Sequence, residues 1–118
     1  MVKRTFDYRK IKKMALSPPL VSRDIFYLID GKYLWYLLPF KEGLLLNRND
    51  STPCKGKEGK RSGLAVFDWV FNNTDINTIY GKIHSKNKAA RYMASLVGME
   101  RSYVENEYIY YEIKNHEI

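Results

Sequence analysis

Lysine, arginine and glycine gather in one stretch of the chain in a pattern that could bind an anion. Lys60 and Arg61 are adjacent there, between Gly59 and Gly63. Glycine allows a backbone to approach a ligand closely, and unpaired amide N–H groups at a helix start attract phosphate groups. We therefore predict a phosphate-type ligand that is bound by the amides of residues 62–65 and neutralised by the neighbouring cations.

The charges that flank two predicted helix starts also favour an anion. Lys57 and the two cations after it precede one helix, and Lys86 and Lys88 flank the start of the next. The N-terminus of a helix carries about half a positive charge, so a cation there costs roughly 0.3–1 kcal/mol unless something negative is bound. Any single lysine could simply solubilise the surface, but for the cluster with glycines we favour the ligand.

Hydrophobic periodicity predicts the elements that must position this cluster. Apolar residues at helical spacing follow Ser62, which could cap that helix, whereas residues 48–61 are polar and contain glycine, which predicts an exposed loop. The dipeptide Asp30-Gly31 between two aromatic-rich runs predicts a hairpin. The other predicted elements are a brief first strand, a helix over 5–14, strands over 25–29, 33–38, 44–47 and 76–83, a helix over 87–97, and strands over 99–104 and 108–113.

Length and composition limit the class of protein. A chain of 118 residues, 45% of them hydrophobic, fits one packed domain over residues 1–118. No apolar run approaches the ~20 residues that cross a bilayer, and the N-terminus lacks a secretory signal, so we predict a cytoplasmic protein with no membrane partner. Cys54 is the single cysteine and no Cys/His pair has zinc-ligand spacing, so we predict neither a disulfide nor a metal site.

Two segments resemble the GNAT superfamily of N-acetyltransferases. Residues 60–65, Lys-Arg-Ser-Gly-Leu-Ala, are similar to its pyrophosphate-binding loop, Gln/Arg-x-x-Gly-x-Gly/Ala, apart from the first position. Residues 79–99, which include Asn87 and Ala90, resemble its strand-then-helix segment at the correct separation from that loop. Residues 67–100 are also similar to small GNAT-like proteins that are encoded by tailed bacteriophages.

The resemblance implies a fold and a co-substrate. The fold would be α+β, with a mixed, mostly antiparallel central sheet and helices on both faces, and the co-substrate would be acetyl-coenzyme A (acetyl-CoA). Its pantetheine arm would lie between the strand at 45–47 and the strand at 79–83, where a backbone N–H would polarise the thioester. The coenzyme-binding residues that the resemblance implies are Leu45, Leu46, Asn47, Lys60, Arg61, Ser62, Gly63, Leu64, Ala65, Asn87 and Ala90.

The resemblance leaves the catalytic groups open. Many members place a tyrosine, as an acid for the leaving thiolate, seven residues after the helix asparagine, and that position is Ala94 here. Some relatives manage without it, since a thiolate is a tolerable leaving group near neutral pH. Candidates for the base, by proximity to the expected cleft, are His84, Glu42 and Asp50. Histidine is the residue type best suited to a base at cellular pH, although a lone histidine after a strand is more often a surface or capping residue.

Three functions are compatible with the sequence. The first is an N-acetyltransferase that moves an acetyl group from acetyl-CoA to an amine of a protein or small molecule, and a net charge of +7 would favour an acidic acceptor surface. The alternative is a catalytically inactive GNAT-fold phage protein that acts as a virion component or a host-directed binding factor. A nucleic-acid-binding module ranks last, because the coenzyme explains the densest positive charge. Residues 1–43 contain no interpretable motif, and whether the last strands pair in a homodimer is left open.

Overall fold

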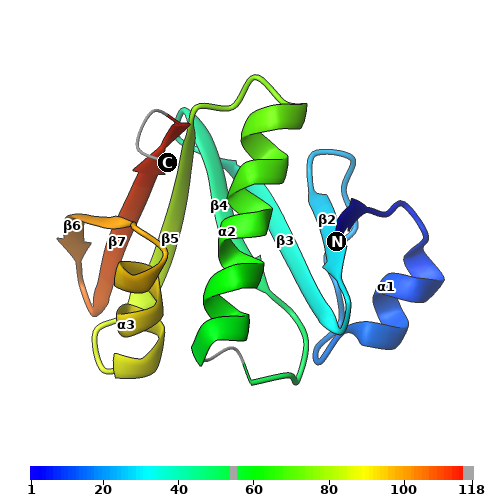
Figure 1. The fold of residues 1–118 in the computed structure, drawn as a ribbon, viewed down its shortest axis with the longest axis horizontal. Coiled ribbons are helices and arrows are strands. Elements are labelled where there is room, and N and C mark those ends of the chain that lie inside the picture. The colour runs from blue at the N-terminus through cyan, green and yellow to red at the C-terminus, as the bar shows by residue number, and fades with distance from the viewer. Residues whose placement is uncertain (54–55, 116–118) are drawn as a thin grey trace.

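In residues 1–53 and 56–115, which the computed structural model describes, seven strands form one sheet (Figure 1). The strand order across the sheet is β1-β2-β3-β4-β5-β7-β6, and every neighbouring pair is antiparallel except β4 and β5. The elements in chain order are β1 (Val2–Arg4), α1 (Tyr8–Met14), β2 (Phe26–Asp30), β3 (Tyr33–Phe40), β4 (Gly43–Arg48), α2 (Gly56–Asn73), β5 (Thr78–His84), α3 (Lys88–Leu96), β6 (Glu100–Glu105) and β7 (Tyr108–Lys114).

The helices cover both faces of the sheet. Figure 1 shows α2 and α3 together in front of it, and the main core lies between these helices and the sheet. Successive side chains of a strand point to opposite faces. Trp35 belongs to the main core, whereas its neighbour Leu34 packs with Tyr27 and with Ile11 of α1 in a smaller cluster. The helix α1 therefore covers the opposite face, over β2 and β3.

Local sequence explains several of these elements. Asp7 caps α1, because its Oδ1 accepts hydrogen bonds from the amides of Arg9 at 3.0 Å and Lys10 at 3.3 Å. The predicted hairpin is confirmed: β2 ends at Asp30, and the two-residue turn begins with Gly31, whose φ of 60° suits glycine.

The predicted order of elements is confirmed, as is the mixed, mostly antiparallel sheet with helices on both faces. The predicted loop over 48–61 is wrong in its later part, because α2 begins at Gly56 rather than near Ser62. Gly59, Ser62 and Gly63 are buried along this helix. Glycine costs about 1 kcal/mol per residue in a helix, so the sequence alone favours a loop here. Burial of this helical face in the fold outweighs that cost.

Candidate functional site

The two central strands separate partway along their length. The parallel pair β4–β5 is in register from Leu44 to Leu46, and Leu46 lies opposite Gly81 at the last paired position. Beyond that point Asn47 stays paired with β3 and Lys82 with β7. The strands therefore leave an opening between them toward their carboxyl ends, which we call the β4–β5 gap.

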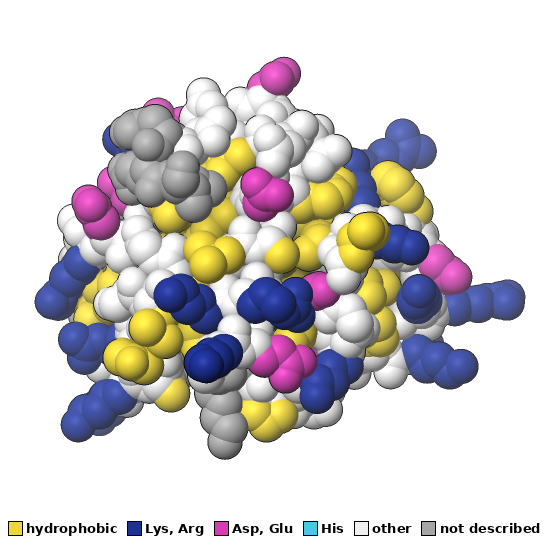
Figure 2. Space-filling view, viewed as in Figure 1, with side chains coloured by type: hydrophobic (Ala, Val, Ile, Leu, Met, Phe, Trp, Pro, Cys, Tyr) yellow, Lys and Arg dark blue, Asp and Glu magenta, His cyan; other side chains and the backbone are white. Residues whose placement is uncertain are grey.

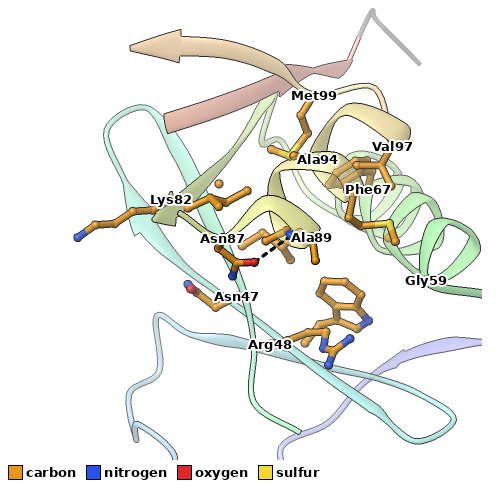
Figure 3. A pocket seen from close by; sticks show the side chains of 17 residues that line it. Asn47, Arg48, Gly59, Phe67, Lys82, Asn87, Ala89, Ala94, Val97 and Met99 are labelled. Atoms are coloured by element: carbon orange, nitrogen blue, oxygen red, sulfur yellow. Dashed lines mark hydrogen bonds between the residues drawn. The ribbon is translucent and has the colours of Figure 1, made fainter. Parts of the chain in front are cut away.

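A pocket of about 440 Å³ lies at the β4–β5 gap, and Figure 3 shows side chains of both strands, α2 and α3 around it. Most of its lining is apolar or glycine, which suits a long and partly apolar ligand. The lining residues are Trp35, Leu46, Asn47, Arg48, Gly59, Gly63, Phe67, Gly81, Lys82, Ile83, Asn87, Ala89, Ala90, Met93, Ala94, Val97 and Met99.

The N-terminal turns of two helices border this pocket. Gly59, in the first turn of α2, and Gly63 lie four residues apart on one face of that helix. Asn87 caps α3, and its Oδ1 accepts a hydrogen bond from the amide of Ala90 at 3.1 Å (Figure 3). The first amides of a helix lack intrahelical partners and attract negative charge. Both helices can thus contribute to binding an anionic group at the pocket.

Strand alternation identifies a backbone donor that faces the β4–β5 gap. Asn49 donates its N–H to the carbonyl oxygen of Leu34 on β3 at 2.9 Å. Alternate residues of a strand direct their N–H groups to the same side, so the N–H of Asn47 also faces β3 and that of Arg48 faces the gap. Because the β4–β5 register ends at Leu46, this Arg48 amide has no strand partner on that side. It can donate to a carbonyl oxygen of a ligand.

The side chain of Arg48 adds a positive charge to the pocket wall. Its Nη2 lies 3.3 Å from Oδ1 of Asp50 and also donates to the carbonyl oxygen of Thr52. Its Nε and Nη1 are buried and have no hydrogen-bond partner among the described residues. A buried donor without an acceptor costs about 1–3 kcal/mol, so an anionic or carbonyl oxygen at this place would stabilise the site.

Five of the residues that the family resemblance implies lie at this pocket: Leu46, Asn47, Gly63, Asn87 and Ala90. Leu45, Lys60, Arg61, Ser62, Leu64 and Ala65 are not part of its lining. Leu45 is buried on the other face of the sheet, because it alternates with Leu44 and Leu46. Leu64 and Ala65 lie along a different side of α2, near Asp68.

The expected pyrophosphate loop over 60–65 is part of a helix. Residues 60–65 follow the first four residues of α2, so their amides donate to carbonyl groups within the helix. The prediction that the amides of residues 62–65 face a ligand is therefore wrong. Lys60 and Arg61 likewise stand in the second turn rather than before the helix. The free amides of α2 belong to the turn that starts at Gly56.

Arg61 and Ser62 instead connect α2 to the sheet. Ser62 Oγ accepts a hydrogen bond from Nε1 of Trp35 at 2.9 Å, and Nη2 of Arg61 lies 3.2 Å from Oδ2 of Asp30. Burial alone would raise the pKa of Asp30. Hydrogen bonds from Ser62 and the amino group of Met1, together with the charges of Arg61 and that amino group, outweigh burial and lower this pKa.

Two of the three candidate bases, Glu42 and Asp50, are not available at the β4–β5 gap. Glu42 lies in the turn before β4, at the end of that strand away from the β4–β5 gap, where its Oε1 accepts a 3.4 Å hydrogen bond from Tyr80. Asp50 is buried, and its carboxylate accepts the amides of Leu34 at 2.6 Å and Thr52 at 2.8 Å. The expectation that Glu42 lies by the cleft is wrong, and Asp50 holds a loop in place.

His84 ends β5 near the gap but has both ring nitrogens engaged. Its Nδ1 accepts the amide of Lys86 at 3.1 Å, and its Nε2 lies 3.3 Å from Oε2 of Glu107. A neutral histidine with this pattern carries its proton on Nε2 and has no free lone pair. It caps a turn, and it would act as a base only after the bond to Lys86 is broken.

Sequence reasoning missed several residues of the pocket wall. The predicted loop over 48–61 contains Gly59. Gly59, Gly63 and Phe67 nevertheless recur at four-residue intervals, which is the spacing of one helical face. Arg48 and Lys82 were missed because only the strand register reveals where β4 and β5 part.

Among residues 1–53 and 56–115, no three His, Cys, Asp or Glu side chains gather as metal ligands. None of the helices in this described part of the chain is long and apolar enough to cross a membrane. Cys54 lies outside the described residues.

This chain resembles known proteins in structure alone. No protein-family model matches this chain, and no curated protein sequence matches it. The N-acetyltransferase PseH of Campylobacter jejuni, in complex with acetyl coenzyme A, has a TM-score of 0.66 and 10% identity, over 91% of this chain and 74% of that chain. A spermidine N-acetyltransferase from Vibrio cholerae, in complex with CoA and spermine, has a TM-score of 0.69 and 11% identity, over 99% and 96% of the two chains.

An acetyltransferase of the GNAT family from Bacillus anthracis is similar too, with a TM-score of 0.62 and 14% identity over 80% of this chain and 68% of that chain. These likenesses confirm the predicted GNAT-like α+β fold. At identities of 10–14% they show the fold alone. The similarity of residues 67–100 to phage proteins stays a prediction.

Proposed function

We propose that this protein is an N-acetyltransferase that takes an acetyl group from acetyl-CoA and transfers it to an amine of a small molecule or protein. The observation that carries the proposal is the β4–β5 gap, which opens after Leu46 and Gly81 at a pocket bordered by the first turns of α2 and α3. This arrangement offers an elongated pocket for a pantetheine arm and helix N-termini for its phosphates. Similar folds have been solved with acetyl coenzyme A and with CoA.

The residues at the pocket fit an anionic coenzyme. In place of the amides of residues 62–65, we propose the first turn of α2, which starts at Gly56, as the pyrophosphate contact. Lys57, Lys60 and Arg61 are exposed on α2, and Figure 2 shows Lys and Arg side chains gathered over the N-terminal half of this helix. The Nε and Nη1 atoms of Arg48, which have no partner among the described residues, would gain an acceptor. The pocket thus has charge and donors for the phosphates and apolar walls for the arm.

The β4–β5 gap would support transfer of the acetyl group chiefly through a backbone donor. The N–H of Arg48 donates to the thioester oxygen and stabilises the negative charge that develops there. The neutral amine attacks the carbonyl carbon, a C–N bond forms, the C–S bond breaks, and the thiolate takes a proton from water. Ala94 supplies no acid at the pocket, and His84 has no free lone pair. The proton of the amine therefore goes to solvent, and we expect the rate to rise with pH.

The acceptor is proposed only as a class. The net charge of +7 favours an acceptor that presents its amine on an acidic surface. A location in the cytoplasm, of a phage host if the gene is a phage gene, is part of the same proposal.

A second candidate function is a binding protein that keeps the fold without catalysis. One observation favours it: Ala94 stands at the pocket where many family members have a tyrosine acid. Such a protein would bind a host or virion partner, and it would bind acetyl-CoA weakly or not at all.

Calorimetric titration with acetyl-CoA, together with thermal melts, tests the proposal. We expect micromolar binding and a stabilisation of about 2.7 kcal/mol when the ligand is at 100 times its Kd. Ala90→Trp should abolish binding, because Ala90 is half-buried at the pocket wall. Ser95→Trp is the matched control, since Ser95 is exposed on the same helix and does not line the pocket. Substitution of Gly63 is less suitable, because an added Cβ would lie 3.1 Å from Cγ1 of Val97.

Absence of binding, or equal loss in both tryptophan variants, would refute the coenzyme site and favour the non-catalytic protein. Binding that only Ala90→Trp abolishes would support the site and justify a search for the acceptor amine.

A further inference from the structure

Lys82 lies between the coenzyme pocket and a second pocket. It lines the 440 Å³ pocket at the β4–β5 gap, and it also lines a pocket of about 490 Å³ that the β6–β7 hairpin forms with it. Lys82 is the first residue of β5 after Gly81, the last position that pairs with β4. Its side chain therefore leaves the strand where the gap begins.

The amine of Lys82 stands on the face of the sheet opposite α2 and α3. Its Nζ lies 4.4 Å from the ring centre of Tyr108 and 6.0 Å from that of Tyr110. Figure 3 shows the side chain extending away from the pocket residues of α2 and α3, such as Phe67 and Ala94. The helix α1 covers the opposite face only over β2 and β3, so this amine is exposed.

No carboxylate holds the amine of Lys82 within the described part of the chain. The ion pairs there involve other residues, and the contacts of Lys82 are with tyrosine rings. Its four-carbon side chain is flexible, and a contact with a ring is weaker than a buried ion pair. The amine can therefore swing from the tyrosines to the gap at little cost.

We propose that Lys82 is itself an acetyl acceptor, acetylated by the acetyl-CoA that is bound in the pocket of the same molecule. The inference rests on the proposed function, because it requires acetyl-CoA at the β4–β5 gap. The neutral Nζ attacks the thioester carbonyl carbon, a C–N bond forms and the C–S bond breaks. The products are N-acetyl-lysine at position 82 and free CoA thiol, with one proton released from the former ammonium group.

Position distinguishes Lys82 from Lys41. A reaction between groups held on one molecule gains an effective concentration that free reactants lack. Lys41 provides the comparison, since it is also exposed and its Nζ lies 3.9 Å from the ring centre of Tyr103. It lies in the turn before β4, at the end of that strand away from the gap. Its hydrogen bond with Tyr103 raises its pKa, which lowers its reactivity further.

Peptide mass spectrometry after incubation with acetyl-CoA tests the inference. We expect Lys82 to be acetylated at least about tenfold faster than Lys41, at a rate that does not change when the protein is diluted tenfold. Excess CoA without an acetyl group should slow the modification of Lys82 and leave that of Lys41 unchanged. Lys82→Arg should remove the fast phase from the intact-mass time course, whereas Lys41→Arg should retain it.

Equal rates at the two lysines, a rate at Lys82 that rises with protein concentration, or no effect of CoA would each overturn the inference. Calorimetry separates this failure from failure of the proposed function. Acetyl-CoA that binds without acetylating Lys82 overturns only the inference, whereas acetyl-CoA that does not bind overturns both.

Discussion

Ser62 offers a test of how α2 is held on the sheet. The residue is 0% exposed, and its Oγ accepts a 2.9 Å hydrogen bond from Nε1 of Trp35. Ser62→Ala removes this acceptor and leaves a buried indole N–H without a partner, which costs about 1–3 kcal/mol of unfolding free energy. For a domain of this size we expect the Tm to fall by at least about 3 °C. Ser62 does not line the pocket at the β4–β5 gap, but its partner Trp35 does, so we expect the affinity for acetyl-CoA to change by less than about tenfold.

Urea unfolding followed by circular dichroism gives the free energies, and a double-mutant cycle assigns the loss to the hydrogen bond. Trp35→Phe should cost less in the Ser62→Ala protein than in the wild type, by about 0.5–1.5 kcal/mol, since the bond is already absent. Ser95→Ala, at an exposed position of α3, is the control and should stay within about 0.5 kcal/mol of the wild type.

The opposite result would refute this placement of Ser62. If Ser62→Ala leaves stability unchanged but weakens acetyl-CoA binding tenfold or more, Ser62 faces the ligand as the loop motif predicts. The register of α2 would then be wrong.

The pKa of Asp30 is lowered, because its hydrogen bonds and the charge of Arg61 outweigh burial, so its ionised form stabilises the protein above the unfolded pKa of about 3.9. Asp30→Asn should therefore destabilise the protein at pH 7 and approach the wild type as urea titrations move below pH 4; a constant difference would contradict this. Gly43→Ala should lower stability by at least about 1–3 kcal/mol, because an added Cβ would lie 2.0 Å from the carbonyl oxygen of Thr78. An unchanged melting temperature would refute that contact.

The elements that sequence reasoning predicted well have a local cause. A two-residue turn at Gly31 between aromatic-rich runs determines its own hairpin, and the apolar stripe of α3 ends at Gly98, whose φ is 89°. The start of α2 depends on tertiary packing instead. Gly59 and Gly63 disfavour a helix locally, and only their burial in the fold explains why the helix extends back to Gly56.

The site was predictable only in part, because it depends on register. Asn87 and Ala90 can be recognised from the sequence, because they stand at fixed positions of one helix start. The position of Glu42 cannot, because a sequence does not show which end of a strand lies at the gap. The register places Glu42 at the end of β4 away from the gap. Arg48 and Lys82 become visible only once β4 and β5 are seen to part.

Packing does not explain why residue 81 is glycine, and we interpret Gly81 as a residue that leaves room for a ligand in the pocket. Glycine inside a strand costs about 0.5–1 kcal/mol relative to alanine. Packing does not require it, since an added Cβ would lie 3.5 Å from Cε of Met99, an ordinary contact. Yet Gly81 lines the pocket at the point where β4 and β5 separate. We therefore expect Gly81→Ala to stabilise the free protein by about 0.5–1 kcal/mol and to weaken acetyl-CoA binding on the order of tenfold, as one misplaced methyl group does in a fitted pocket. Urea unfolding and calorimetry measure the two effects, and a variant that is both more stable and equally tight in binding would show that the ligand does not contact this wall.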